Sequence, residues 1–218
     1  MTATLIGATG LIGSYLLNEL LNDSFYDTIK IIIRKPLDIT HPKLEKKVVD
    51  FSNSDSLLIA IDNSDVVFCT VGTTQRKVKG DKEAYRKVDY DIPVKAARFC
   101  KMTGCETFVI VSSVGANSKS NSFYLKLKGE VEDVVKEVKL KSVHIMRPSI
   151  LLGDRKEFRL GEKISKLLVP LSFLLPSRFK PIQAKMVAIA MLNAAKENKE
   201  GFCVYEYKEI RELSWNKN

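Results

Sequence analysis

Residues that build metal centres and disulfide frameworks are scarce in this sequence of 218 residues, which has only four cysteines and two histidines. No two cysteines form a C-x-x-C pair, and the histidines, His41 and His144, stand far apart in the chain. A zinc site is therefore not expected, and no metal-ligating residue is predicted. Reduced thiols in a cytosolic protein are the simplest interpretation of the cysteines.

Long apolar runs are lacking as well. The longest, Leu167 to Leu175, is interrupted by Pro170 and followed by Pro176, so it is too short to cross a bilayer. A β-prone segment begins at residue 2, which leaves no room for a signal segment before it. These features predict a cytoplasmic protein without a membrane span.

The charge balance is basic, with 35 Lys and Arg against 26 Asp and Glu and a formal net charge of +9. Such a balance can indicate an acidic partner such as nucleic acid. Here the basic residues are spread along the whole chain, and no basic segment is interleaved with aromatic residues. A solvated basic surface is the favoured interpretation, and no nucleic-acid partner is expected.

The N-terminal stretch MTATLIGATGLIG carries the clearest motif in the chain. Thr2–Ile6 is short and apolar enough for a buried strand, and apolar residues then recur at helical spacing from Leu11 to Leu21. Between them, Gly7, Gly10 and Gly13 have the G-x-x-G-x-x-G spacing of a dinucleotide-binding turn. Gly7 would permit the tight turn, Gly10 the approach of a pyrophosphate, and Gly13 close packing of the helix on the sheet. The alternative is a glycine-rich turn without a ligand.

A second buried strand is expected at Thr28–Ile33, and it ends in Arg34 and Lys35. In doubly wound folds, a residue about 20 positions beyond the glycine motif meets the adenosine ribose. An acid there selects the 2′-hydroxyl of NADH, whereas no acid occurs here before Asp38. A guanidinium and an ammonium suit a 2′-phosphate, so the sequence favours NADP(H) over NAD(H). Two solvated charges at a strand end are the alternative.

The remaining chain alternates strand and helix patterns, which predicts one α/β domain over residues 1–218 with a doubly wound parallel sheet and helices on both faces. The segment 73–80 is polar and basic and is expected to form a loop. Further strands are expected at 48–51, 65–69, 107–112, 141–146 and 202–205, and helices at 56–61, 81–102 with a break near Pro93, 123–138, 161–168 and 183–196.

A Tyr-x-x-x-Lys pair, Tyr124 and Lys128, lies in the helix expected at 123–138. Residues at i and i+4 share one helical face. A protonated Lys128 would favour the phenolate form of Tyr124 and lower the pKa of the phenol toward the working pH. A tyrosine tuned in this way can exchange a proton with a carbonyl or alcohol oxygen. An ordinary half-exposed helix pair is the alternative.

The position of this pair distinguishes it from a second copy of the pattern. Tyr26 and Lys30 have the same spacing but fall at a loop–strand junction, where they would not share a helical face. The copy at Tyr124 follows the fifth expected strand, which ends in Ser112 and Ser113. A serine hydroxyl at that strand end could hydrogen-bond the same substrate oxygen, and a simple turn cap is the alternative.

The segments GATGLIG, VGTT, SSVGA, YLKLKGE and RPSILLGDR together resemble the short-chain dehydrogenase/reductases. More closely, they resemble the atypical branch that includes the Tat-interacting protein oxidoreductases. The similarity runs from the first strand to about Arg155 and more loosely to the end of the chain. The resemblance implies a Rossmann fold that binds NADPH. By matching position, it places Thr9, Gly10, Leu11 and Ile12 at the pyrophosphate, Arg34 and Lys35 at the 2′-phosphate, Val71 and Gly72 at the centre of the cofactor, and Arg147 and Arg155 at the nicotinamide end. Gly7, Tyr124 and Lys128 are further expected cofactor-binding residues.

The resemblance also implies catalytic roles. Tyr124 would be the proton donor or acceptor with Lys128 beside it, and Ser113 rather than Ser112 would be the catalytic serine. One departure concerns the asparagine that many of these reductases use in a proton relay. The nearest position here is Asp89, so a relay through that site is in question.

The predicted function is that of an NADP(H)-dependent oxidoreductase that reduces a carbonyl or oxidises an alcohol. A small substrate-side region is expected at about 150–182, and its apolar segment Leu167–Phe179 favours an apolar substrate, although plain core would explain that segment equally well. The alternative function is an NADPH-binding regulator or redox sensor that acts through a protein partner without turnover.

Overall fold

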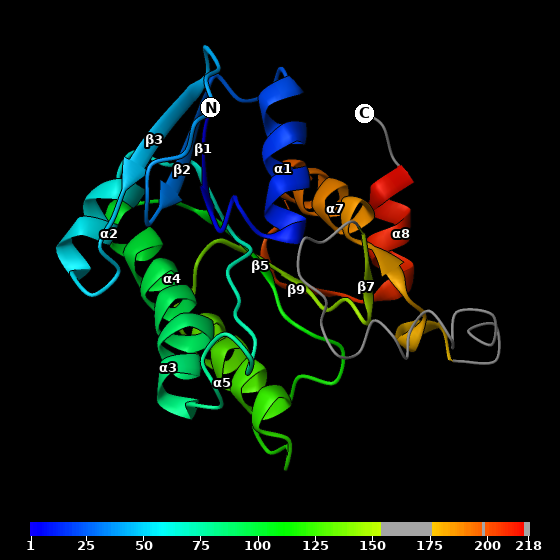
Figure 1. The fold of residues 1–218 in the computed structure, drawn as a ribbon. Coiled ribbons are helices and arrows are strands. Elements are labelled where there is room, and N and C mark those ends of the chain that lie inside the picture. The colour runs from blue at the N-terminus through cyan, green and yellow to red at the C-terminus, as the bar shows by residue number, and fades with distance from the viewer. Residues whose placement is uncertain (154–175, 198, 216–218) are drawn as a thin grey trace.

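The computed structural model describes residues 1–153, 176–197 and 199–215. Within them, seven strands form one parallel sheet in the order β3-β2-β1-β4-β5-β6-β9 (Figure 1). This order confirms the predicted doubly wound sheet. The strands are β1 (Thr2–Ile6), β2 (Thr28–Ile33), β3 (Leu44–Val48), β4 (Val66–Cys69), β5 (Thr107–Val111), β6 (Ser142–Met146) and β9 (Gly201–Tyr205).

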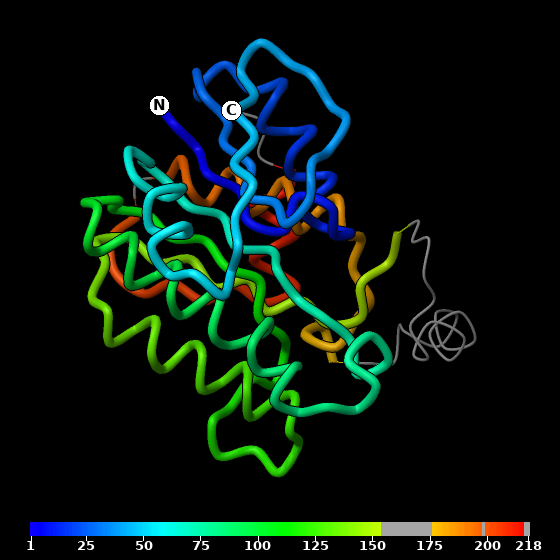
Figure 2. Tube along the Cα trace, turned by 60° about the vertical axis from the view of Figure 1, so that its left-hand side comes forward, coloured from blue at the N-terminus to red at the C-terminus, as the bar shows by residue number. Residues whose placement is uncertain are grey.

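The helices form one layer on each face of the sheet, as Figures 1 and 2 show. One layer contains α1 (Leu11–Asn22), α7 (Ala184–Lys196) and α8 (Tyr207–Trp215). The other contains α2 (Ser54–Ile61), α4 (Ile92–Thr103) and α5 (Phe123–Glu137), preceded by the short helix α3 (Lys82–Arg86) and the π-helical turn η1 (Lys87–Asp91). A 3₁₀ turn, η3, spans Ser177–Phe179.

Each face of the sheet has its own apolar core, because strands buried on both faces present side chains alternately to the two layers. Leu5 and Ile31 pack with Leu16 of α1 on one side. Ile6 and Ile32 pack toward the α2 and α4 layer on the other. The apolar runs of the inner strands are therefore explained by their position between two helical layers.

The third strand differs from the prediction. It spans Leu44–Val48, and residues 49–51, which were expected to complete a strand at 48–51, follow it instead. The strand lies at the edge of the sheet and is largely solvent-accessible, so it carries Glu45, Lys46 and Lys47. An edge strand needs no continuous apolar run. The apolar residues Val48, Val49 and Phe51 therefore led to a strand predicted too late in the chain.

The helical segment after residue 81 is interrupted, as its proline predicted. The interruption takes the form of the π-helical turn η1, and Pro93 lies in the first turn of α4, where its missing N–H has no cost. A π-helical turn inserted between α-helices is often found at functional sites. Here it carries Asp89.

A helix and a small sheet were not predicted, and one predicted helix falls outside the described residues. Helix α8 and a two-stranded sheet of β7 (Leu151–Leu152) with β8 (Ile182–Gln183) were both missed. The helix expected at 161–168 and most of the apolar segment Leu167–Phe179 lie outside the described residues. The small sheet joins the two ends of the region expected at 150–182, whose role stays a prediction.

The strand order reverses between β1 and β4, which lie side by side although β2 and β3 intervene in the chain. In open α/β sheets, ligands bind at such a switch point, beyond the carboxyl ends of the strands. None of the described helices has the length and apolarity needed to cross a membrane.

Candidate active site

The glycine turn joins β1 to α1, and its backbone is packed too closely for side chains at Gly7 and Gly13. Gly7 has φ +96°, a conformation that favours glycine. The Gly10 N–H donates a hydrogen bond of 2.9 Å to the Gly7 carbonyl. A Cβ atom on Gly13 would lie 2.1 Å from that same carbonyl oxygen, so only glycine allows α1 to approach the turn this closely. The structure therefore gives Gly7 and Gly13 the geometric roles that their spacing predicted.

Thr70, which follows β4, holds the turn from the neighbouring strand, and sequence reasoning missed it. Its Oγ1 donates to the carbonyl oxygens of Ile6 (3.1 Å) and Gly7 (3.2 Å), and its N–H donates to the Ile6 carbonyl (2.9 Å). The carboxyl ends of β1 and β4 are joined in this way. The position of Thr70 at the end of the strand next to β1 is the signal that could have identified it.

The first turn of α1 provides a setting for an anion. In the described part of the chain, no side chain caps the helix at its N-cap residue Gly10, and both Thr9 and Gly10 are exposed. The first N–H groups of a helix have no partner within the helix and carry partial positive charge. The backbone at Leu11 and Ile12 can therefore donate to a pyrophosphate, so these residues fit the predicted cofactor.

Arg34 and Lys35 are both exposed and directly follow β2. Arg34 lines a shallow hollow of about 370 Å³ together with Val48, Val49, Asp50 and Phe51, which lie at and beyond the end of β3. The residues after β3 are further candidates for contact with the adenosine end of a dinucleotide, and sequence reasoning had assigned them to a strand instead.

Beyond β4, Val71, Gly72 and Thr73 pass next to the buried carboxyl group of Asp89. The Thr73 N–H donates to Asp89 Oδ2 at 2.7 Å, and a Cβ atom on Gly72 would lie 3.5 Å from Asp89 Oδ1. Tyr85 supports the same segment, since its hydroxyl donates to the Thr73 carbonyl at 3.3 Å. The segment predicted to contact the centre of the cofactor is thus fixed by η1 and α3.

Lys128 of α5 forms an ion pair with Asp89, with 3.2 Å between Nζ and Oδ1. The two side chains are only 8% and 2% exposed. Burial by itself lowers the pKa of the Lys128 ammonium, but attraction to Asp89 and the interaction with Tyr124 outweigh burial and leave that pKa raised. Lys128 therefore remains charged at neutral pH.

Tyr124 is half-buried and lies one helical turn before Lys128 on the same face of α5. The electrostatic interaction between the two places them in one cluster, as their spacing predicted. The other copy of the pattern has a different environment. Tyr26 is in the core, and Lys30 lies in β2, where its ammonium donates to the Asp62 carbonyl at 2.7 Å.

Gly129 keeps α5 in contact with the loop that carries Ser113, and it too was missed. A Cβ atom on Gly129 would lie 2.1 Å from the Ser118 nitrogen and 2.2 Å from the Asn117 carbonyl carbon. The Asn117 N–H also donates to the Leu125 carbonyl at 3.1 Å. The loop between β5 and α5 is thereby held against the helix that carries Tyr124. A glycine directly after Tyr-x-x-x-Lys was the available signal.

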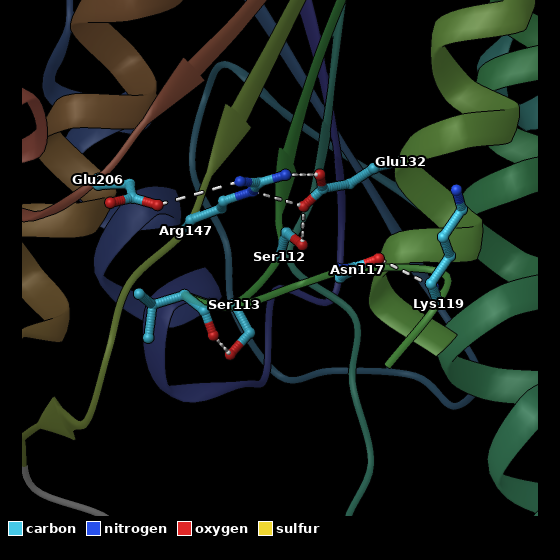
Figure 3. A network of polar contacts seen from close by, with 8 residues as sticks. Ser112, Ser113, Asn117, Lys119, Glu132, Arg147 and Glu206 are labelled. Atoms are coloured by element: carbon cyan, nitrogen blue, oxygen red, sulfur yellow. Dashed lines mark hydrogen bonds and ion pairs between the residues drawn. The ribbon is translucent and has the colours of Figure 1, made fainter. Parts of the chain in front are cut away.

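The two serines after β5 have different surroundings (Figure 3). Ser112 is buried and donates to Glu132, whose carboxylate is also bound by the Arg147 guanidinium. Ser113 is half-buried and lies apart from this network, and its hydroxyl makes a long hydrogen bond of 3.3 Å to the Val114 carbonyl. Ser113 is therefore the more available of the two, in agreement with the choice made from the resemblance.

Arg147 is expected near the nicotinamide, but its guanidinium binds the carboxylates of Glu132 and Glu206. Its Nε donates to Glu132 Oε1 at 3.0 Å, and its Nη1 lies 3.9 Å from Glu206 Oε1. The two carboxylates lie on different sides of the guanidinium (Figure 3). The hydrogen bonds that Arg147 donates to Glu132 are the main cause of the raised pKa of its guanidinium. A contact of Arg147 with the cofactor stays a prediction. Arg155 lies outside the described residues.

In the described part of the chain, no group of three His, Cys, Asp or Glu side chains could hold a metal ion. The three cysteines Cys69, Cys100 and Cys105 are buried, Cys203 is half-buried, and all four are free thiols.

Comparison with known proteins agrees with this geometry. The model of a family described as NAD(P)H-binding matches residues 7–167. The rat protein HTATIP2 (Rattus norvegicus) is 37% identical over 165 residues, which is 74% of this chain and 67% of the relative. FMP52-1, mitochondrial, from Scheffersomyces stipitis is 33% identical over 225 residues, which is 98% of this chain and 97% of the relative.

Solved structures share the fold at low sequence identity. MoeE5 in complex with UDP-glucuronic acid and NAD aligns over 98% of this chain and 81% of its own, with a TM-score of 0.73 and 19% identity. WbmH from Bordetella bronchiseptica in complex with NAD⁺ aligns over 94% of this chain and 75% of its own, with a TM-score of 0.73 and 17% identity. At this identity the likeness establishes the Rossmann-type fold.

The relatives correct one expectation. The FMP52 proteins of Scheffersomyces stipitis, Candida glabrata and Candida albicans are named mitochondrial, so the prediction of a cytoplasmic location is wrong. That prediction depended on the absence of sequence features, and absence carries little information about location. The family match and the fold agree on the rest: the chain belongs to the NAD(P)H-binding family, and its relatives include HTATIP2 and the FMP52 proteins.

Proposed function

We propose that the protein is an NADP(H)-dependent oxidoreductase that reduces a carbonyl group or oxidises an alcohol. The observation that carries this proposal is the buried, charged Lys128, held one helical turn from Tyr124 at the carboxyl edge of the sheet. Burial of a charged side chain is costly unless the charge is paired, and the Lys128 ammonium is paired with Asp89. A paired ammonium next to a phenol is suited to proton transfer.

The proposed binding site follows the carboxyl edge of the sheet. The backbone N–H groups of Leu11 and Ile12 would bind the pyrophosphate at the start of α1. Arg34 and Lys35 would bind the 2′-phosphate, since both are exposed and Arg34 lines the hollow at the end of β3. Gly72 would let the backbone pass close to the centre of the cofactor. When bound, the cofactor would supply the hydride for reduction of a carbonyl, or accept it in oxidation of an alcohol.

The chain's own residues would handle the proton. Tyr124 would give its phenolic proton to the substrate oxygen in the reductive direction and take it back in the oxidative direction. Lys128 would stabilise the phenolate formed in this step. Ser113 would hydrogen-bond the substrate oxygen, because its hydroxyl is free of the Glu132 network that occupies Ser112.

Calorimetric titration with NADPH and then NADH tests the proposal. We expect wild-type protein to bind NADPH much more tightly than NADH. The double variant Arg34→Ala/Lys35→Ala should lose most of its NADPH affinity and little of its NADH affinity, because only NADPH has the 2′-phosphate. Lys46→Ala/Lys47→Ala, which also removes two positive charges, from the exposed Lys46 and the half-buried Lys47 of the neighbouring strand β3, is the matched control and should keep the preference.

Equal losses for both cofactors in the Arg34/Lys35 variant would contradict the NADP assignment. If NADPH binds and no carbonyl compound causes loss of nicotinamide absorbance, the chain would instead be an NADPH-binding regulator that acts through a protein partner. Absence of binding by either cofactor would overturn both functions.

A further inference from the structure

Asp89 connects two parts of the candidate site through one carboxyl group. Its Oδ2 accepts the Thr73 N–H of the segment after β4 at 2.7 Å, and its Oδ1 lies 3.2 Å from Lys128 Nζ on α5. The π-helical turn η1 places it there, and its side chain is 2% exposed. A carboxylate this deeply buried needs partners, and both of its oxygens have one.

The charge on Lys128 depends on this carboxylate. Burial is the largest influence on Lys128 and acts to lower its pKa. Attraction to Asp89 is the largest opposing influence, and together with smaller effects it leaves the pKa raised. If Asp89 were neutral, burial would dominate and the proton on Lys128 would be held more weakly.

The surroundings of Lys128 offer no substitute for Asp89. Within the described residues, the groups that act on Lys128 are Asp89 from η1, Tyr124 from α5 itself and Cys69 from the end of β4. Burial raises the pKa of the Cys69 thiol to about 12, so the thiol is uncharged at neutral pH. Glu130 is close in sequence but forms an ion pair with Arg86 at 2.7 Å. Asp89 is thus the one carboxylate in this set.

We propose that Asp89 is a positioning residue that keeps the buried Lys128 ammonium charged and fixed beside Tyr124, and that anchors the Gly72–Thr73 backbone to the same point. It therefore replaces the asparagine relay that the resemblance implies with a fixed negative charge. The consequence for turnover rests on the proposed function, whereas the effect on Lys128 is a property of the protein without ligands.

The test follows the protonation of Lys128 directly. Protein labelled with ¹³Cε-lysine is titrated by NMR from about pH 6 to about pH 11, a range that includes the ordinary lysine pKa. The Lys128 signal is the one missing from Lys128→Arg. In wild-type protein we expect Lys128 to lose its proton at higher pH than the exposed lysines. In Asp89→Asn we expect it to do so at lower pH than those lysines, because burial then dominates.

Glu130→Gln is the matched control. It also removes one carboxylate from an ion pair that joins α5 to the segment before α4, but its partner is Arg86. The Lys128 titration should stay at its wild-type position in this variant. An unchanged Lys128 titration in Asp89→Asn, or an equal shift in Glu130→Gln, would overturn the proposal.

A stability measurement decides the case if Asp89→Asn does not fold. The double variant Asp89→Asn/Lys128→Met removes the unpaired ammonium as well, so it should recover folded structure and a cooperative urea transition that Asp89→Asn alone lacks. A double variant that is no more stable than the single one would overturn the pairing. None of these measurements requires a cofactor, so they stand even if NADPH does not bind.

Once a substrate is known, the pH profile gives a further readout. In Asp89→Asn, kcat should begin to fall at lower pH on its alkaline side than in wild-type protein, because Lys128 loses its charge earlier. A uniform loss of activity at every pH would indicate that Asp89 only supports the fold, and would overturn the catalytic part of the proposal.

Discussion

Two buried carboxylates lie near the carboxyl edge of the sheet, and they differ in the cation that neutralises them. Asp89 is paired with Lys128, and Glu132, one helical turn beyond Lys128 on α5, is paired with Arg147. A lysine can lose its proton when its surroundings change, whereas an arginine stays charged at any ordinary pH. The first pair is therefore suited to chemistry and the second to a permanent structural connection.

Their further partners support this distinction. Asp89 also binds the backbone of Thr73, in the segment predicted to contact the cofactor. Glu132 also binds Ser112, and Arg147 reaches Glu206 just before α8, so this pair connects α5 with β5, β6 and the C-terminal helix (Figure 3). Similar chemistry thus has two uses within one turn of a helix.

Tyr124→Phe should have the largest effect on kcat, and it changes the cluster of Lys128 and Asp89 without touching the pair of Glu132 and Arg147. Loss of the phenolic proton should lower kcat by about a hundredfold to ten-thousandfold, the usual contribution of a general acid. NADPH affinity by calorimetry and the urea midpoint should stay near wild type, because the ring remains. Tyr15→Phe, on α1, is the control for loss of a hydroxyl. A Tyr124→Phe protein with full activity would remove Tyr124 from the mechanism.

Arg147→Met should act mainly on stability. It leaves the Glu132 carboxylate, 5% exposed, without its cation. Breaking a fully buried pair costs about 3 to 5 kcal/mol, and the loss here should be smaller because the Arg147 side chain is 25% exposed. Urea unfolding measures this loss. Arg147→Met/Glu132→Gln should recover part of it, because the unpaired charge is then gone. Equal stability of Arg147→Met and wild type would show that the two carboxylates do not differ as described.

The two adjacent serines should differ in the same way: one should affect catalysis and the other stability. Ser113→Ala should lower kcat by about a hundredfold or more, since it removes a hydrogen bond to the reacting oxygen. Ser112→Ala should instead lower the free energy of unfolding by about 1 kcal/mol through the lost bond to Glu132, with a much smaller change in kcat. The reverse result would assign the catalytic role to Ser112.

Features that depend on neighbours in the sequence could be predicted. Gly7, Gly10 and Gly13 lie within seven residues at the junction of β1 and α1, so their spacing indicated the turn and, through it, a Rossmann-like doubly wound fold. Tyr124 and Lys128 are likewise fixed by one helical turn. In both cases local geometry determines the contact.

Features that depend on distant segments could not. The partner of Lys128 is 39 positions away, on a π-helical turn that no local pattern announced, so Asp89 was recognised only as a departure from the family. The role of Gly129 depends on a loop that crosses the helix at Asn117 and Ser118. Helix α8 was missed because its pattern is short and mixed with charges.

The connection between Thr70 and the glycine turn has a consequence for folding. The Thr70 hydroxyl and the Gly7 carbonyl are 63 positions apart in the chain, so their hydrogen bond can form only after a long loop has closed. Parallel pairing over such separations is slow. The turn that fits a pyrophosphate therefore gains its final shape only when β4 has joined β1, and a nascent chain would have no dinucleotide site until then. Cofactor binding would in that way distinguish finished molecules from unfinished ones.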